Sequence, residues 1–219
     1  MSSVLVVGAS RGIGLELARQ FQRRGDSVVA TCRTPSPDLD KLGVRTISGL
    51  DVADETSVRR MAEQLQGVNL DVVVHNAGIG LNDALETLDV ELVREHFEVN
   101  TLGPLRVALA LLPQLRAGAR LALITSRLGS ISDNSSGSLY GYRISKAGLN
   151  MLGVNLARDL RAQRIAVGIL HPGTVATEMT DWEGAPVAEA AQGLIERIDE
   201  LDLENSGTFW HANGEVLGW

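Results

Sequence analysis

Tyr142 and Lys146 are four residues apart, a spacing that could support acid–base chemistry. On a helix, residues i and i+4 lie on one face, so the phenol and the ammonium would reach the same space. An ammonium beside a phenol favours the phenolate and lowers the tyrosine pKa from its usual value of about 10. Only Lys41 and Lys146 are lysines among the 20 basic residues. We therefore interpret Tyr142 as a general acid/base; the alternative is a half-buried tyrosine beside a solvated lysine.

A glycine-rich segment near the N-terminus has the spacing of a nucleotide-binding turn. It reads Gly8-Ala9-Ser10-Arg11-Gly12-Ile13-Gly14 and joins the first expected strand to the first expected helix. Glycines allow a tight turn and a close approach of the backbone to a pyrophosphate at the helix N-terminus. A purely structural turn is the alternative. We predict that a dinucleotide contacts Gly8, Ser10, Arg11, Gly12, Ile13 and Gly14.

The end of the second expected strand indicates which dinucleotide is bound. An acid at this point would accept the 2′-hydroxyl of the adenosine ribose. The strand instead ends Thr31-Cys32-Arg33, without an acid. Arg33, joined by Arg11, could bind a 2′-phosphate; two surface arginines are the alternative. We predict a preference for NADP(H) over NAD(H).

Two further strand ends carry residues suited to the ligand-binding edge of a parallel sheet. Asp51-Val52 follows the third expected strand, and His75-Asn76-Ala77-Gly78 ends the fourth. Small residues there let the backbone pass close to a ligand. Asp and Asn are also common turn residues, which is the structural alternative. The residues that we expect at the cofactor are Asp51, Val52, Asn76, Ala77 and Gly78.

The elements that must position these residues alternate between strand and helix. Short runs rich in Val, Ile and Leu are apolar on both faces, as in a parallel sheet covered on each side. The expected strands are Val4–Val7, Ser27–Thr31, Arg45–Ser48, Asp71–His75, Leu121–Thr125 and Ile165–Leu170, with a last one around Thr208–His211. The expected helices are Gly14–Arg24, Glu55–Gln66, Val90–Leu115 and Tyr142–Arg161. We predict one α/β domain, residues 1–219, with a doubly wound Rossmann-type sheet of about seven parallel strands and helices on both faces.

Composition narrows the classes of partner and compartment. The 219 residues are 44% hydrophobic and carry a net charge of -7, which argues against nucleic acid or an anionic membrane as a partner. Cys32 is the only cysteine, so no intramolecular disulfide can form, and a reducing compartment is expected. No apolar run approaches the roughly 20 residues of a membrane span. We expect a cytoplasmic protein, with no metal site because no cluster has metal-ligand spacing.

Several motifs occur in a fixed order along the chain: Gly8-x-x-x-Gly12-x-Gly14, Asn76-Ala77-Gly78, Asn100, Ser126, Tyr142-x-x-x-Lys146 and Pro172-Gly173-Thr174-Val175-Ala176-Thr177. Taken together and in this order, they resemble the motifs of the short-chain dehydrogenase/reductase family over nearly the whole chain. The segments Gly129–Ile131, Gly141–Arg143 and Gly207–Trp219 look most like small bacterial carbonyl reductases and C-signal-like proteins of that family.

The resemblance implies roles for the catalytic residues. Tyr142 would be the general acid/base, and Lys146 would lower its pKa and hold the nicotinamide ribose. Asn100 would position a water in a proton relay; it precedes Gly103-Pro104, where a kink could turn its side chain inward. A serine would polarise the substrate carbonyl. Spacing from the tyrosine points to Ser130, but Ser126-Arg127-Leu128-Gly129 matches the family pattern better, and we choose Ser126.

The resemblance also implies a second cofactor-binding segment after the sixth strand. Pro172 and Gly173 would begin it, the backbone of Val175 would bind the carboxamide, and Thr177 would bind a phosphate oxygen. Glu178–Glu183 would form a short lid with apolar Met179 and Trp182. The expected activity is NADP(H)-dependent interconversion of a carbonyl and an alcohol on a small substrate. The alternative is an NAD(P)-binding signalling or sensor protein of the C-signal type.

The long expected helix at Val90–Leu115 predicts self-association. Its apolar residues surround more than the single stripe that covers a sheet, so a second partner is needed. In the family the helices equivalent to this one and to Tyr142–Arg161 pair across a two-fold axis, which implies a homodimer or homotetramer. A kinked helix buried in its own subunit is the alternative. The apolar residues are Leu92, Val93, Phe97, Leu102, Leu105, Val107, Leu109, Leu111 and Leu112.

Overall fold

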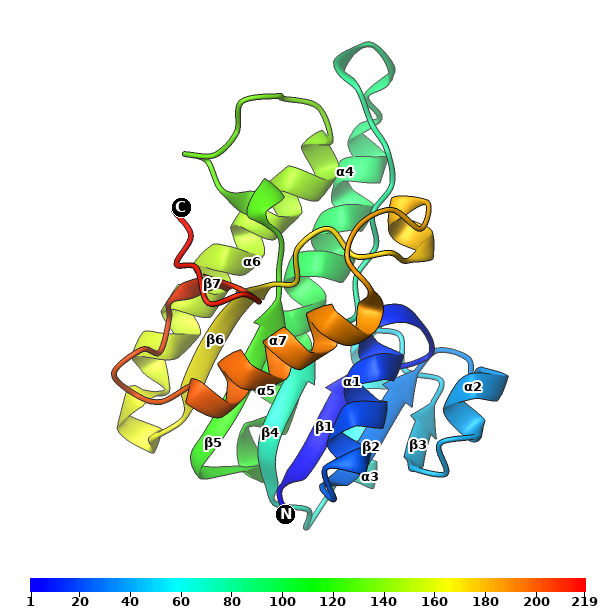
Figure 1. Cartoon of the computed structure of the whole chain (residues 1–219), viewed down its shortest axis with the longest axis vertical. Helices are drawn as coiled ribbons and strands as arrows, with labels where there is room; N and C mark the ends of the chain where they lie inside the picture. Colours follow the sequence, from blue (N-terminus) through cyan, green and yellow to red (C-terminus); the bar gives the residue numbers. More distant parts are fainter.

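A computed structural model describes residues 1–219, and its seven strands form one parallel sheet (Figure 1). The spatial order is β3-β2-β1-β4-β5-β6-β7, so the direction of winding reverses between β1 and β4. This is the doubly wound Rossmann-type fold that the alternating apolar runs predict. The strands are β1 (Ser3–Val7), β2 (Ser27–Cys32), β3 (Arg45–Ser48), β4 (Leu70–His75), β5 (Leu115–Ile124), β6 (Ala166–His171) and β7 (Phe209–His211).

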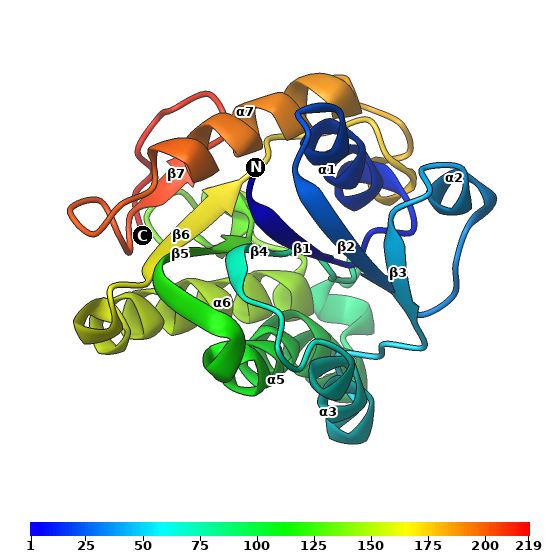
Figure 2. The same ribbon diagram turned by 90° about the horizontal axis from the view of Figure 1, so that it is seen from below.

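Helices cover both faces of the sheet (Figure 2). On one face lie α1 and α7 with the short α2, and on the other lie α3, α5 and α6, with α4 beside α6. The helices are α1 (Gly12–Arg23), α2 (Pro37–Asp40), α3 (Glu55–Gln64), α4 (Val90–Phe97), α5 (Gly103–Leu111), α6 (Tyr140–Asp159) and α7 (Val187–Glu200). The connection between β2 and β3 contains Pro35 and Pro37, and it holds only the single helical turn of α2.

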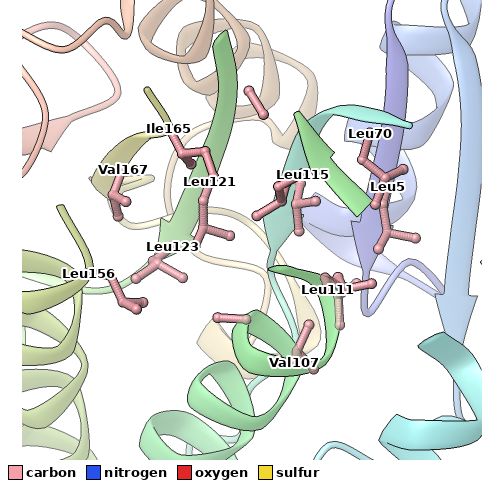
Figure 3. Packing of buried hydrophobic residues seen from close by; sticks show 14 of the residues in the cluster. Leu5, Leu70, Val107, Leu111, Leu115, Leu121, Leu123, Leu156, Ile165 and Val167 are labelled. Atoms are coloured by element: carbon pink, nitrogen blue, oxygen red, sulfur yellow. The ribbon is translucent and has the colours of Figure 1, made fainter. Parts of the chain in front are cut away.

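Strand alternation divides the core into two layers, one on each side of the sheet. On β1, Val4 and Val6 face α1 and α7, while Leu5 and Val7 face α3, α5 and α6. Figure 3 shows the second layer, where strand residues meet Val107 and Leu111 of α5. Full burial of such a side chain stabilises the fold by about 1.5–3 kcal/mol. The two apolar layers hold the strands in place, so the residues at the carboxyl edge of the sheet have defined positions.

The prediction of one helix over Val90–Leu115 is wrong. The chain forms α4, then a π-helical segment at Glu98–Leu102, then α5 and a 3₁₀ turn at Leu112–Gln114. A π segment adds a residue to a turn and changes the direction in which its side chains point. The continuous apolar pattern hides this change because both halves still bury one face.

Two other elements differ from expectation. β5 begins at Leu115 rather than Leu121, with a register shift against β4 between Leu70 and Val72. The helix α7 was not expected, although Ala191, Leu194, Ile195 and Ile198 have helical spacing and are buried. The last strand is confirmed as β7, although it has only three residues.

Candidate active site

The carboxyl edge of the sheet gathers the residues that could do chemistry. Tyr142 and Lys146 lie in the first turns of α6, and Ser126 lies two residues after the end of β5. Lys146 is 5% exposed, and its Nζ donates to the carbonyl oxygen of Ile124 at 3.0 Å, which ties α6 to the end of β5. The Nζ atom lies 5.7 Å from the centroid of the Tyr142 ring. The phenol and the ammonium therefore share one space, as their spacing on a helix predicts.

Burial controls the ionisation of both groups. It lowers the pKa of Lys146 to about 8, because a buried ammonium is poorly solvated. Burial also raises the pKa of the Tyr142 phenol, and a hydrogen bond with the Ser126 side chain opposes that rise. The expectation that Lys146 lowers the Tyr142 pKa is thus not met in this structure. Desolvation of the phenol outweighs the other influences, and the ammonium is already bound to a carbonyl.

Ser126, rather than Ser130, lies at the tyrosine. Ser126 is buried, its side chain acts to lower the pKa of Tyr142, and it accepts from the backbone N–H of Leu128 at 3.2 Å. Ser130 is also buried, but its Oγ lies 3.2 Å from the Oγ of Ser132 and accepts from the N–H of Asp133 at 3.2 Å. The strand end therefore directs Ser126 toward the site, whereas Ser130 stabilises the loop that follows.

The π-helical segment places Asn100 inside the molecule. Asn100 is fully buried, and its Oδ1 accepts from the N–H of Ile79 at 2.8 Å. Its Nδ2 donates to the Ile79 carbonyl at 2.9 Å and to the Ser145 Oγ at 3.0 Å. A Cβ at Gly78 would lie 3.0 Å from Oδ1 of Asn100 and 3.6 Å from Nζ of Lys146. The inward position expected for Asn100 is observed, but a π turn rather than a proline kink produces it.

The glycine-rich turn after β1 is packed too closely for side chains. Gly8 has φ +84°, and a Cβ there would lie 2.7 Å from the Cα of Ala77. A Cβ at Gly14 would lie 2.1 Å from the carbonyl oxygen of Gly8. Asn76 closes this turn from β4, because its Nδ2 donates to the same oxygen at 2.8 Å. The start of α1 is therefore a backbone cradle that fits a pyrophosphate.

The segment after β6 meets the glycine turn from the other side. Pro172 and Gly173 begin it, and Gly173 has φ +87°. A Cβ at Gly12 would lie 3.4 Å from Cγ2 of Thr177, so these two predicted cofactor residues face each other. Val175 is 2% exposed, and its carbonyl accepts from the Thr180 Oγ1 at 2.5 Å. The structure thus brings the two predicted cofactor segments together.

Four predicted cofactor residues, Ser10, Ile13, Asp51 and Val52, also make contacts within the fold itself. Ser36 donates from its Oγ to the Ser10 carbonyl at 2.5 Å, which links the glycine turn to the segment after β2. Ile13 packs, half-buried, against the core on the α1 side. Asp51 accepts from the N–H of Ala53 at 2.9 Å, and Val52 is buried against Gly103. The Asp51 side chain therefore takes part in a turn, which is the alternative interpretation of this residue.

Of the two predicted phosphate-binding arginines, one is paired with an acid and the other is free. Arg11 forms an ion pair with Glu178, with side chains 74% and 64% exposed, and Arg33 is exposed with no ion pair. A pair so exposed contributes little and is readily exchanged. Next to Arg33 in the sequence, Cys32 ends β2 as a buried free thiol, whose pKa is raised by burial and then by Asp40. No acid side chain ends this strand.

Three residues near Tyr142 were missed. Asp83 lies between β4 and α4, and its carboxylate accepts from the backbone N–H groups of Tyr140 and Gly141. His96 of α4 lies edge-on to the Tyr142 ring, with centroids 6.3 Å apart. Arg143 donates from Nε to the carbonyls of residues 137 and 138, at 3.1 Å each. No local signal marks these residues, because their partners are set by tertiary packing.

The structure also shows whether the chain holds a metal-binding cluster or a helix that could cross a membrane. No group of three or more His, Cys, Asp or Glu side chains is arranged to hold a metal ion. None of the helices has both the length and the apolar character needed to cross a bilayer.

The comparisons with known proteins agree with this geometry. A family model described as short chain dehydrogenase matches residues 2–186. The chain is 45% identical to 1-hydroxy-2-glutathionyl-2-methyl-3-butene dehydrogenase from Rhodococcus sp. (strain AD45), with 100% of both chains covered. It is 42% identical to the C-signal protein of Myxococcus xanthus, over 68% of this chain and 93% of that protein.

Solved structures give the same result. An NADPH-bound carbonyl reductase from chicken fatty liver superposes with a TM-score of 0.91 at 30% identity, covering 100% of this chain and 99% of the other. A carbonyl reductase from Pseudomonas aeruginosa PAO1 in complex with NADP has a TM-score of 0.86 at 32% identity, with both chains fully covered. The chain belongs to the short-chain dehydrogenase family.

Proposed function

We propose that this protein is an NADP(H)-dependent oxidoreductase that interconverts a carbonyl and an alcohol on a small molecule, with Tyr142 as general acid/base. Membership of the family supports one part of this proposal, that the protein is an oxidoreductase that acts on a carbonyl or an alcohol. The observation that carries the finer proposal is the meeting of Tyr142, Ser126 and Lys146 at one strand end. Residues 1–219 would act as a single nucleotide-binding domain.

The bound nicotinamide would supply or accept the hydride. The chain's own residues handle the proton and the developing charge. Because its pKa is raised, the Tyr142 phenol is protonated at neutral pH and can donate to a carbonyl oxygen. Ser126 would donate a hydrogen bond to the same oxygen, and Lys146 is charged below about pH 8. Asn100 would hold a water of the relay.

Apolar side chains near the phenol favour an apolar group next to the reacting carbon. A Cβ at Gly80 would lie 3.1 Å from Sδ of Met179 and 3.6 Å from Cε2 of Tyr142. Met179 and Trp182 are 55% and 72% exposed, so they are available to a ligand. The relative from Rhodococcus supports including glutathione-conjugated alcohols among the substrates tested.

The test follows NADPH oxidation against para-nitrobenzaldehyde, acetophenone and menadione, and NADP⁺ reduction with a glutathione-conjugated alcohol. Ser126→Ala should lower kcat by about 10²–10³-fold, the usual effect of losing one oxyanion donor. Ser130→Ala is the matched control and should retain kcat, because its Oγ is engaged within the loop. An equal loss in both variants would exclude the assignment of Ser126.

The preference for NADP(H) rests on Arg33, on the absent acid at the end of β2, and on relatives solved with NADP or NADPH. Replacing Cys32 by Asp together with Arg33→Ser should shift the ratio of NADPH to NADH dissociation constants toward NADH. An acid there accepts the 2′-hydroxyl and repels a 2′-phosphate. If the unmodified protein binds both cofactors equally, the preference is wrong.

A signalling or sensor role is the second candidate, favoured by the similarity to the C-signal protein. Such a protein would bind the cofactor without turning over any carbonyl in the panel. A cofactor dissociation constant measured beside the kinetics distinguishes the two candidates. The cytoplasmic location also remains a proposal, supported by the single free cysteine.

We further propose that a second copy of the chain packs on the face formed by α5 and α6. Leu109 of α5 is 56% exposed, and Ile144 and Met151 of α6 are 48% and 63% exposed. These helices lie on the same face of the sheet (Figure 2). A two-fold contact between copies would remove these side chains from water.

A further inference from the structure

The helix that carries Tyr142 has no cap of its own. Its N-cap residue is Leu139, which offers no side-chain acceptor. An N-cap oxygen normally accepts from the free backbone N–H groups of the first turn. The preceding backbone is left-handed at three successive residues, Gly137, Ser138 and Leu139, with φ of +64°, +57° and +52°. The first turn of α6 therefore needs an acceptor from elsewhere in the chain.

Asp83 supplies this acceptor from a segment 57 residues earlier in the sequence. Its Oδ1 accepts from the N–H of Tyr140, and its Oδ2 accepts from the N–H of Gly141 at 2.8 Å. Its backbone carbonyl accepts from the N–H of Leu139 at 3.1 Å. Asp83 is 7% exposed and pairs with no Lys or Arg, so the helix N-terminus is what compensates its charge. Three consecutive N–H groups thus depend on one residue.

Gly141 and His96 fit closely around this contact. A Cβ at Gly141 would lie 3.1 Å from Oδ2 of Asp83 and 2.7 Å from Nδ1 of His96, so a side chain would push the carboxylate away. His96 is fully buried; its Nδ1 lies 2.8 Å from the Leu92 carbonyl, and its Nε2 accepts from the N–H of Leu81 at 3.0 Å. The ring thereby holds the backbone two residues before Asp83 onto α4.

We propose that Asp83 is a positioning residue for the reaction. It lies outside α6 but caps the N-terminus of this helix, so that the first turn keeps Tyr142 next to Ser126. The inference rests on the proposed role of Tyr142 as acid/base. When the cap is removed, the first turn frays and the phenol moves away from Ser126. The glycine turn belongs to the start of α1, and Lys146 is held separately by the Ile124 carbonyl, so binding of the cofactor should change little.

The primary experiment compares Asp83→Ala with Asp54→Ala. Asp54 performs the same task on α3, where Oδ1 and Oδ2 accept from the N–H groups of Thr56 and Ser57 at 2.9 and 3.2 Å. We expect Asp83→Ala to lower kcat for para-nitrobenzaldehyde by about 10–100-fold, the scale of a small misplacement of a reacting group. The dissociation constant of NADPH should stay within about twofold, and Asp83→Asn, which keeps one acceptor, should recover part of kcat. Asp54→Ala should retain kcat at saturating NADPH despite a similar fall in Tm.

A double-mutant cycle separates positioning from general loss of structure. If Asp83 acts through the phenol, Asp83→Ala should cost nothing further in kcat once Tyr142→Phe is present. Additive losses, or an equal kcat loss in Asp54→Ala, would overturn the proposal. So would an unchanged kcat in Asp83→Ala.

Hydrogen exchange provides a measurement independent of turnover. Amides of residues 139–142 should exchange faster in Asp83→Ala, and Gly141→Ala should give the same pattern because it displaces the carboxylate. Unchanged protection there would contradict the cap itself. Failure of the proposed function appears differently: Tyr142→Phe would then keep full activity, whatever Asp83 does to exchange.

Discussion

At the scale of single residues, the site depends on where a strand ends and how deeply a helix is buried. Ser126 reaches Tyr142 because β5 stops two residues earlier, and Lys146 is held by the Ile124 carbonyl of the same strand. The types and spacing of Tyr142 and Lys146 were readable from the sequence. The direction in which the pKa of Tyr142 shifts could not be read from the sequence, because it follows from burial by residues far away in the chain.

The phenol of Tyr142 should be essential, whereas that of Tyr140 should not. Tyr142→Phe removes the proton donor and keeps the ring, so kcat should fall by about 10²–10⁴-fold, the usual contribution of a general acid. NADPH binding, measured by fluorescence titration, should change little. Tyr140→Phe is the control, because the structure gives its backbone N–H, and not its hydroxyl, a partner. Activity that survives in Tyr142→Phe would contradict the assigned role.

At the scale of elements, local signals predicted more than long-range ones. The glycine turn and the strand ends follow from a few adjacent residues each, and they lie where expected. The break at Glu98–Leu102 could not be seen, because the apolar pattern continues through it. Asp83 could not be assigned either, because its acceptor role exists only once the segment before α4 packs on α6.

Close packing against Val52 should make Gly103, the first residue of α5, intolerant of a side chain. A Cβ there would lie 2.8 Å from Cγ2 of Val52, which is itself 5% exposed. Gly103→Ala should lower the free energy of unfolding by about 1–3 kcal/mol, as overpacking does. Urea denaturation measures this loss. Adding Val52→Ala should recover part of it; if the double variant only adds a further loss, the two side chains do not clash.

At the scale of the whole molecule, buried histidines should make the fold sensitive to acid. Burial lowers the pKa of His75 to about 3, and His171 is lowered to about 3 in the same way. The unfolded chain binds protons below pH 6.5 that the folded chain does not, so stability falls as pH drops from 6.5 toward 3.

For His75 alone the loss amounts to about 2 kcal/mol at pH 5. Unfolding free energies at pH 7 and pH 5 should therefore differ less in His75→Asn than in the unmodified protein. His75 is 2% exposed, so solvent screening does not reduce this effect. Equal differences in the two proteins would show that His75 does not carry the acid sensitivity.

Self-association is the second expectation at this scale. Light scattering at micromolar concentration should give a mass two or four times the 23.4 kDa of one chain. Met151→Glu should reduce the mass, because a charge on the exposed face of α6 opposes burial. Leu85→Glu is the control, since Leu85 is 66% exposed on the segment before α4. A concentration-independent mass of 23.4 kDa would remove the expectation.

The single thiol at the end of β2 provides a built-in reporter. Cys32 is 3% exposed and its pKa is raised, so alkylating reagents should modify it only when the surrounding backbone opens. It adjoins Arg33, where the adenosine end of a cofactor would lie. The rate at which Cys32 is alkylated therefore measures local opening of the backbone at the end of β2. A bound cofactor should lower this rate. One mass-spectrometric time course can thus follow occupancy without a substrate, a dye or an engineered label.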